Sequence, residues 1–208
     1  NNLRKISWNG ITEEYRAYIW KLLTGYLPVN TQRQKESLRL KREEYSEMVQ
    51  KFFYEEKMSR TSLEKDILRQ IQKDVPRTHP SKLFQSTQIM QSLERLLYIW
   101  SIRHPASGYV QGMDNLATPF FLVFLSDELQ KPCHETLELD SLPDEILKNV
   151  ECDTFWCLDS FLNFVQNFYT NGHPGIYKVV DKIESIIQKS ENQLYQHLLK
   201  LQDEGLGL

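Results

Sequence analysis

The sequence has little that would build a β-sheet or cross a membrane. Alternating apolar and polar runs are nearly absent, and no Asn-Gly or Asp-Gly turn separates two such runs. The longest apolar run, residues 119–125, is far shorter than the ~20 residues that a membrane helix needs. The first six residues lack the apolar centre of a signal peptide. We therefore expect a soluble, cytoplasmic protein with no transmembrane segment.

Cysteine is also scarce. Cys133, Cys152 and Cys157 are odd in number and widely spaced, which fits reduced thiols better than a disulfide framework. A zinc site that combines them with His134 is the alternative, but no CxxC pair supports it, and we expect no metal site. The chain also lacks a GxSxG motif and a P-loop. A hydrolase acting on its own small substrate is therefore disfavoured.

The composition is that of a globular domain. Of 208 residues, 40% are apolar and 25% charged, with 10 Phe, 10 Tyr and 4 Trp, enough for a sizeable core. The net charge of -3 does not favour nucleic acid as a partner. Residues 31–51 are basic and residues 127–153 are acidic, and such runs are usually solvated surface. The length suits one large domain or two small ones.

Helical periodicity dominates the pattern and predicts an all-α fold. The apolar stripe in residues 86–103 has the spacing of one helix face, and its members are Ile89, Leu93, Leu96, Leu97 and Trp100. Residues 154–169 are apolar on almost every side, which predicts a buried central helix. We expect further helices at 12–24, 31–57, 61–72 and 175–201. Residues 126–151 are predicted to be an irregular acidic segment.

Two short motifs lie where helices are expected to end. The first, residues 71–77, has the form IxxDxxR and precedes Pro80. The second, residues 109–113, reads YxQGM and follows Pro105 and Gly108. Proline and glycine break helices, so side chains at these places are offered to solvent or to a partner. Taken alone, such an Arg or Gln is most often a solvated surface residue, and YxQGM also fits a helix N-terminal loop.

The chemistry of the two motifs is complementary. Arg77 offers a planar fork of donors that suits phosphate oxygens, and Asp74 can hold that guanidinium. Gln111 carries an acceptor and a donor, which can orient an attacking water. Gly112 leaves room for a partner's backbone, and Tyr109 offers flat contact area beside it.

At these residues the chain resembles the TBC family of Rab GTPase-activating proteins, which is marked by IxxDxxR and YxQ. The surrounding residues match as well, with Thr78 and Pro80 after the first motif and residues 107–113 around the second. Residues 4–11, 153–156 and 172–176 also look like segments of that family. The resemblance spans nearly the whole chain, which we read as a single domain over 1–208, and points to the Golgi-associated branch.

The resemblance implies a function in trans. Arg77 and Gln111 would be an arginine finger and a glutamine finger that complete the site of a GTP-bound Rab, with Asp74, Tyr109 and Gly112 in support. The Rab brings GTP and Mg²⁺, so the chain needs no cofactor of its own and is not an enzyme acting alone. It is expected at the periphery of endomembranes, the Golgi above all.

Two departures from the family pattern stand out. Thr12 occupies a place where the family usually has Pro, which affects only a helix start. The chain stops at Leu208, whereas the family's domain continues with further helices. We therefore expect the C-terminal part of the domain to be missing and the helix at 175–201 to expose apolar surface. The alternatives are a non-catalytic Rab-binding scaffold and a helical interaction domain unrelated to GTPases.

Overall fold

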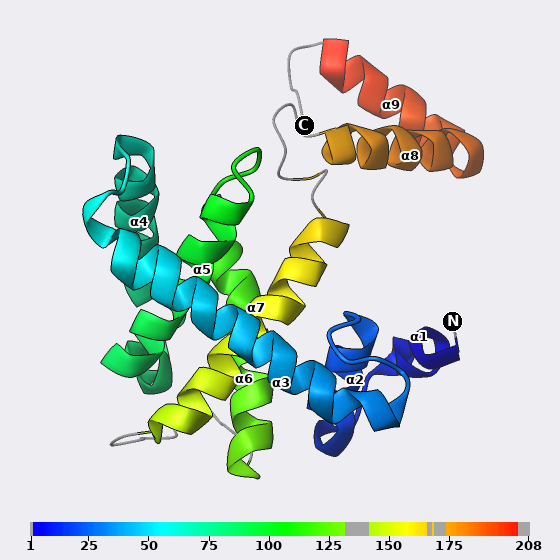
Figure 1. The fold of residues 1–208 in the computed structure, drawn as a ribbon. Coiled ribbons are helices and arrows are strands. Elements are labelled where there is room, and N and C mark those ends of the chain that lie inside the picture. The colour runs from blue at the N-terminus through cyan, green and yellow to red at the C-terminus, as the bar shows by residue number, and fades with distance from the viewer. Residues whose placement is uncertain (1, 132–141, 166–167, 169–173, 204–208) are drawn as a thin grey trace. The chain divides into compact units, whose positions relative to one another are not determined.

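The computed structural model describes residues 2–131, 142–165, 168 and 174–203. Helices and turns make up these ranges, and no strand occurs in them, which confirms the all-α prediction (Figure 1). The chain divides into two compact units, Asn1–Asn163 and Phe164–Leu208. That residues 1–208 form one domain stays a prediction.

The helices of the first unit begin with two short elements before the longer ones. Their bounds in chain order are α1 (Asn2–Ile6), the 3₁₀ turn η1 (Ser7–Asn9), α2 (Glu13–Leu23), α3 (Thr31–Met48), the π-helical segment η2 (Val49–Tyr54), the 3₁₀ turn η3 (Glu55–Met58), α4 (Ser62–Asp74), the 3₁₀ turns η4 (Val75–Arg77) and η5 (Lys82–Gln85), α5 (Thr87–Arg103), α6 (Met113–Leu129) and α7 (Asp144–Phe164). The second unit holds α8 (Pro174–Ser190) and α9 (Asn192–Asp203).

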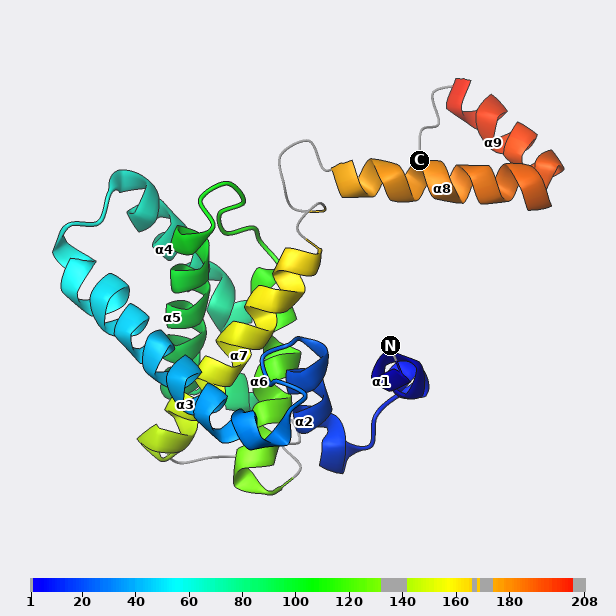
Figure 2. The same ribbon diagram turned by 45° about the vertical axis from the view of Figure 1, so that its right-hand side comes forward.

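Helix α5 lies in the core of the first unit. The predicted apolar stripe is buried, with at most 3% of the surface of each residue exposed, and its members are Ile89, Leu93, Leu96, Leu97 and Trp100. Helices α4 and α6 pack against it (Figure 2). The prediction of a buried helix over residues 154–169 is confirmed for its first part only, because α7 is buried at residues 150–155, 157 and 158 whereas Phe164 at its end is exposed. Helices α5, α6 and α7 carry most of the buried apolar residues of the first unit.

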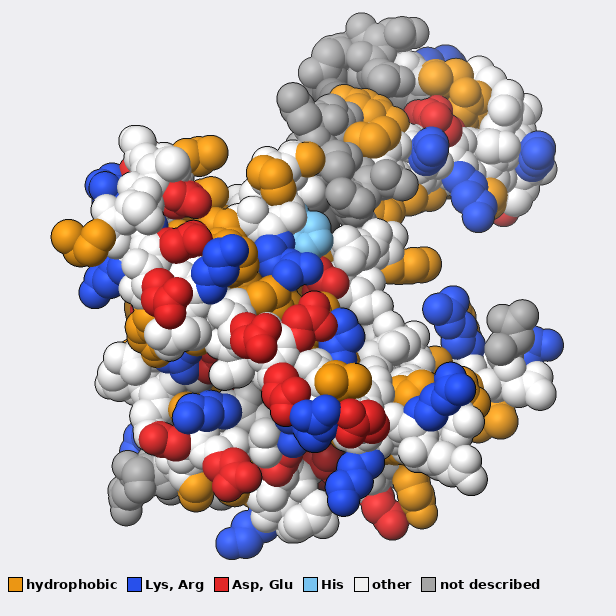
Figure 3. Space-filling model, viewed as in Figure 1, with side chains coloured by type: hydrophobic (Ala, Val, Ile, Leu, Met, Phe, Trp, Pro, Cys, Tyr) orange, Lys and Arg blue, Asp and Glu red, His pale blue; other side chains and the backbone are white. Residues whose placement is uncertain are grey.

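The outer helices start at polar caps. The Asn30 carbonyl oxygen of the side chain accepts a hydrogen bond from the backbone of Gln32 (3.0 Å) at the start of α3. Thr61 and Glu64 form a capping box at the start of α4. Charged residues cover the outer face of α3, as the mixed red and blue of Figure 3 shows. One pair on this helix is Arg39 with Glu36. This agrees with the prediction of a charged, partly exposed helix at 31–57. The α-helix stops at Met48, however, and the rest of the predicted range is the π-helical segment η2 and the 3₁₀ turn η3.

Helix α6 was not predicted from the sequence, because Pro119 lies within it. Proline has no N–H and cannot donate to the carbonyl of Asn115, one turn earlier. The hydroxyl of Thr118 donates to that carbonyl instead, at 3.0 Å. Since Pro119 is exposed, its ring displaces no core side chain. The helix therefore continues through a residue that usually ends one.

Three other predicted boundaries were wrong. The segment 126–151 is not irregular at its ends, because α6 runs to Leu129 and α7 begins at Asp144. Residues 132–141 of that segment lie outside the described residues. Helix α7 ends at Phe164, before the predicted 169. The predicted helix at 175–201 is two helices, which separate at Glu191 between Ser190 and Asn192, residues that favour helix ends.

The second unit is an α8–α9 helical hairpin with one apolar side. The two helices pack against each other. Large apolar residues of α8 are nevertheless exposed, as predicted, among them Tyr177, Val179, Val180, Ile183 and Ile186. None of the helices in the described ranges is both long and apolar enough to span a bilayer.

A buried carboxylate ties the first unit together. Asp153 on α7 is fully buried, forms ion pairs with Lys21 on α2 (2.7 Å) and Arg42 on α3 (3.1 Å), and accepts a hydrogen bond from Tyr26 (2.6 Å). Two cations and a hydroxyl thus compensate one buried anion, and three helices meet at it. Such a network loses more when one member is removed than it contributes as a whole.

We predict that Asp153→Ala lowers the free energy of unfolding by about 3–5 kcal/mol, because Lys21 and Arg42 would stay near the core without their anion. Urea denaturation followed by circular dichroism measures this. The matched control is Asp66→Ala, which removes the exposed partner of Arg69 and should cost less than about 1 kcal/mol. Equal losses for the two variants would contradict the prediction.

Candidate functional site

The first motif ends helix α4 and continues into the turn η4. Ile71 and Val75 are fully buried and fix this turn against the core. Pro76 follows Val75 at the start of the turn. The side chain of Arg77 is 62% exposed. The chain beyond is fastened by Gln85, whose amide donates to the Pro76 carbonyl at 3.0 Å. Arg77 therefore projects from a 3₁₀ turn, where the sequence predicted a stiff loop bracketed by prolines.

The second motif forms a tight turn at the start of α6. The N–H of Met113 donates to the Val110 carbonyl (3.1 Å), which places Gln111 and Gly112 at the centre of the turn. Gly112 has φ 99° and ψ -10°, the left-handed conformation that the third position of a type II turn requires. A Cβ at Gly112 would meet no atom within 4 Å, so the space above the turn is open. Gln111 is exposed, while Met113 is buried and anchors the turn.

The carboxylate of Asp74 joins the two motifs. It accepts hydrogen bonds from Arg77 (2.5 Å), from Tyr109 (3.0 Å) and from Gln70 (3.1 Å). Only 2% of its side chain is exposed. Arg77 and Tyr109 thus share one acceptor, and Gln111 follows Tyr109 by two residues. The predicted role of Asp74 in holding the Arg77 guanidinium agrees with this geometry.

The electrostatics keep this cluster in one protonation state. Burial raises the pKa of Asp74, but the hydrogen bonds from Arg77, Gln70 and Tyr109 outweigh it, and the pKa lies below its ordinary value. Burial, with the carboxylates of Asp114 and Asp74, raises the pKa of Tyr109 well above its ordinary value. At neutral pH the carboxylate is therefore charged and the phenol keeps the proton that it donates.

Sequence reasoning missed several members of the site. Asp114, in the first turn of α6, accepts hydrogen bonds from the Gly112 N–H (3.1 Å) and from the Tyr109 hydroxyl (3.2 Å). Because that hydroxyl has one proton, it donates to Asp74 or to Asp114 at any moment. Thr78 donates to the side chain of Asn115 at 3.4 Å, a second link between the loops. The sequence did carry a signal for Asp114, because an acidic residue just after a turn is typical of the first turn of a helix.

No part of this site has the donors for a metal. Within the ranges that the structure describes, no three His, Cys, Asp or Glu side chains gather to hold an ion. The zinc alternative is not tested, because Cys133 and His134 lie outside the described residues. Cys152 and Cys157 are buried free thiols. Burial raises the pKa of the Cys157 thiol to about 12, so it stays protonated and unreactive.

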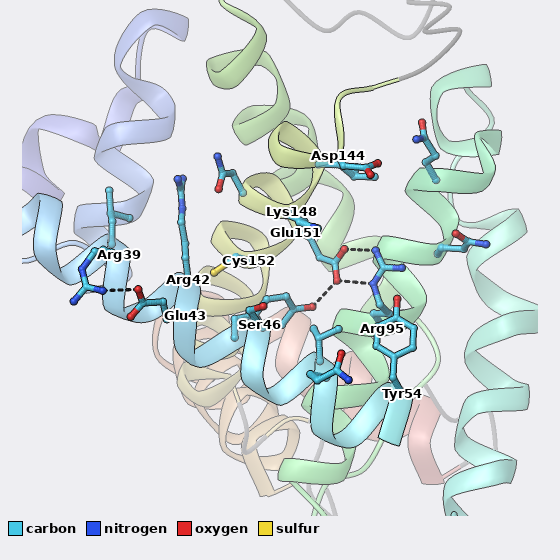
Figure 4. Close-up of a pocket in the computed structure, with 18 of the residues that line it drawn as sticks. Arg39, Arg42, Glu43, Ser46, Tyr54, Arg95, Asp144, Lys148, Glu151 and Cys152 are labelled. Carbon is cyan, nitrogen blue, oxygen red and sulfur yellow. Dashed lines mark hydrogen bonds and ion pairs between the residues drawn. The ribbon is translucent and has the colours of Figure 1, made fainter. Parts of the chain in front are cut away.

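A cleft of about 900 Å³ lies elsewhere, between α3, α5 and α7 (Figure 4). At the wall of the cleft, Glu151 accepts hydrogen bonds from Arg95 (2.6 Å) and Tyr45 (2.8 Å). The charges of Glu151 and Arg95 are therefore already paired with each other. Neither Arg77 nor Gln111 is among the residues that line it. The cleft is therefore separate from the two predicted fingers.

Comparison with known proteins identifies a family. A sequence model of the family described as the Rab-GTPase-TBC domain matches residues 13–205. The chain is 41% identical to TBC1 domain family member 22B of Homo sapiens over 207 residues, which is 99% of the chain and 40% of that protein. It is 41% identical over 201 residues to the GTPase-activating protein GYP1 of Saccharomyces cerevisiae, 94% of the chain and 31% of that protein.

A solved structure shows the same fold. The crystal structure of the Ypt/Rab-GAP domain of Gyp1p matches with a TM-score of 0.84 and 40% sequence identity. The match covers 98% of this chain and 63% of that one. The chain thus spans less than two thirds of the solved domain and of the two relatives named above. Taken with the family match over residues 13–205, these likenesses show that the chain belongs to the Rab-GTPase-TBC domain family.

Proposed function

We propose that the protein activates GTP hydrolysis by a Rab-family GTPase, and that Arg77 and Gln111 enter the partner's site as an arginine and a glutamine finger. The observation that carries the proposal is the Asp74 carboxylate, which holds the bases of two loops while Arg77 and Gln111 stay exposed. Family membership and a relative named as a GTPase-activating protein support it.

Arg77 supplies positive charge to the transition state. Phosphoryl transfer spreads negative charge over the transferring oxygens, and a fixed guanidinium offsets it. Asp74 binds one Arg77 nitrogen, Nη2, which orients the group and leaves other N–H donors for phosphate. An arginine finger contributes about 10³–10⁵ in rate, or roughly 4–7 kcal/mol of barrier.

Gln111 places the attacking water. Its amide has an acceptor for the water proton and a donor for a phosphate oxygen. The type II turn presents this side chain beside Gly112, where a partner's backbone meets no Cβ. By holding the water next to the phosphate, Gln111 lowers the entropic part of the barrier to hydrolysis.

The partner supplies everything else. The GTP-bound Rab carries GTP and Mg²⁺, and this chain contributes side chains rather than a cofactor of its own, so it is an activator and not an enzyme acting alone. In keeping with its resemblance to the Golgi-associated branch, we place the protein at the periphery of endomembranes, the Golgi above all. A non-catalytic Rab-binding scaffold is the competing outcome.

We predict that Arg77→Ala and Gln111→Ala each reduce the acceleration of GTP hydrolysis by at least ~100-fold, because each removes a transition-state contact. Arg77→Lys should fail as well, since a point charge does not reproduce the planar fork. The measurement is phosphate release from a panel of GTP-loaded Rabs with the full-length protein. Arg69→Ala, another exposed Arg near the end of α4, is the matched control and should keep activity.

The same panel separates the competing outcomes. Binding to GTP-loaded Rabs without acceleration of any of them would support the scaffold. If the protein accelerates a Rab and both finger variants remain near the wild-type rate, the activator role survives and the assignment of the fingers is wrong.

We predict that Tyr109→Phe lowers the acceleration by about 5–30-fold, the effect of one hydrogen bond lost from a buried cluster. The change removes only the hydroxyl that links the second loop to Asp74. Tyr15→Phe, on an exposed tyrosine of α2, is the control and should have no effect. Wild-type turnover in the Tyr109 variant would show that the Asp74 link does not position Gln111.

A further inference from the structure

A buried carboxylate contacts the turn that carries Gln111 at its centre. Asp114, in the first turn of α6, is only 3% exposed. Its Oδ1 accepts a hydrogen bond from the Gly112 N–H at 3.1 Å and lies 3.2 Å from the Tyr109 hydroxyl. That N–H belongs to the peptide group that joins Gln111 to Gly112. Asp114 therefore binds the backbone directly after the glutamine.

The direction of this peptide group distinguishes the two commonest types of turn. In types I and II the first central residue has nearly the same φ, but the peptide between the two central residues is turned by about half a revolution. The second central residue then has a φ of about −90° in type I and about +80° in type II. Gly112 has φ 99° and ψ -10°, so the turn is type II. In this orientation the Gly112 N–H faces Asp114.

The other contacts of the turn do not choose between the two types. The hydrogen bond from the Met113 N–H to the Val110 carbonyl closes a turn of either type. Gly112 adopts positive and negative φ about equally well. A Cβ at Gly112 would meet no atom within 4 Å, so packing at this residue does not select a type either. The contact with Asp114 is therefore what favours type II.

Asp114 also opposes the alternative turn. A carboxylate oxygen accepts hydrogen bonds and donates none. If the peptide group turned over to type I, the Gln111 carbonyl oxygen would replace the Gly112 N–H in front of the carboxylate. Two acceptors would then face each other, and the Gly112 N–H would lose its partner. The same side chain thus stabilises one orientation of the peptide and destabilises the other.

We propose that Asp114 is a positioning residue for Gln111, and that its carboxylate holds the peptide between Gln111 and Gly112 in the type II orientation. The inference rests on the proposed function, in which Gln111 places the water. Fixing this peptide fixes the ψ angle of Gln111. Without the acceptor the turn exchanges between the two types, and a group that is held less precisely lowers the rate. Affinity for the Rab changes little, because Arg77 and the rest of the exposed surface are untouched.

We predict that Asp114→Leu, which removes both acceptor oxygens at similar volume, lowers kcat for Rab-bound GTP by about 5–30-fold with KM nearly constant. Asp114→Asn keeps one acceptor oxygen but adds a donor that a turned carbonyl can use, so its kcat should lie between those of the wild type and Asp114→Leu. Phosphate release with the full-length protein measures both. The matched control is Asp144→Leu, on an exposed acid in the first turn of α7, which should keep the wild-type kcat.

Hydrogen exchange at the Gly112 amide reports the state of the turn independently of activity. With isotope-labelled glycine, NMR should show slow exchange in the wild type and faster exchange in Asp114→Leu, because the N–H has lost its acceptor. The Gly108 N–H donates to the His104 carbonyl at 2.8 Å and is the internal control. It should exchange equally in both proteins, whereas a general loss of stability would speed exchange at both amides.

Two further variants test whether Asp114 acts through the glutamine and its turn. In a Gln111→Ala background, Asp114→Leu should cause little further loss of kcat, because no finger is left to position. Gly112→Ala should lower kcat to a similar degree, since alanine rarely adopts a positive φ, and it leaves the buried side chains unchanged. This variant keeps the test decisive if Asp114→Leu does not fold.

The outcomes separate the two proposals. If Gln111→Ala keeps the wild-type rate, the assignment of this finger in the proposed function fails. If Gln111→Ala is slow but Gly112→Ala, or a folded Asp114→Leu, keeps the wild-type kcat, only the role of Asp114 is overturned. A loss in Asp114→Leu that is equally large in the Gln111→Ala background, or that comes with unchanged exchange at Gly112, would overturn it as well.

Discussion

One buried carboxylate, that of Asp74, holds the site together. Arg77 and Tyr109 come from segments that precede and follow α5 in the chain, and both donate to it. Two loops that moved independently would each lose conformational entropy when a partner fixed them. The Asp74 carboxylate is charged at neutral pH and shielded from water, and it holds both loops. Much of their conformational entropy is therefore already lost in the free protein. The exposed ends of the loops remain available for contact.

The sequence predicted those features of the site that neighbouring residues determine. It did not predict those that depend on contacts between distant parts of the chain. Proline and glycine marked the ends of helices, which was enough to single out Arg77 and Gln111 as exposed. The stripe of α5 followed from its spacing alone. The type II conformation of Gly112, the acceptor role of Asp114 and the link from Thr78 to Asn115 depend on contacts across the fold. The catalytic roles of the two fingers remain predictions that the geometry supports.

The charges of the molecule divide into two kinds with different consequences. Those on the exposed face of α3 pair with neighbours one turn away, and such exposed pairs contribute little to stability. Asp153 and Glu151 lie inside, where each is compensated by donors from other helices. Buried pairs of this kind are sensitive to the loss of a partner, so they fix how α2, α3, α5 and α7 meet. The loops that carry Arg77 and Gln111 therefore begin from helices whose positions are fixed.

Pro119 divides α6 mechanically. The first turns of the helix follow Gln111, and one backbone hydrogen bond is missing where they join the later turns. The hydroxyl of Thr118 donates to the Asn115 carbonyl that this leaves without its usual backbone donor. A helix is weakest to bending where its ladder of hydrogen bonds is interrupted. The first turns of α6 are nevertheless buried at Met113, Asp114 and Ala117. Side-chain packing, rather than an unbroken ladder of hydrogen bonds, therefore keeps the start of this helix in place beneath the Gln111 turn.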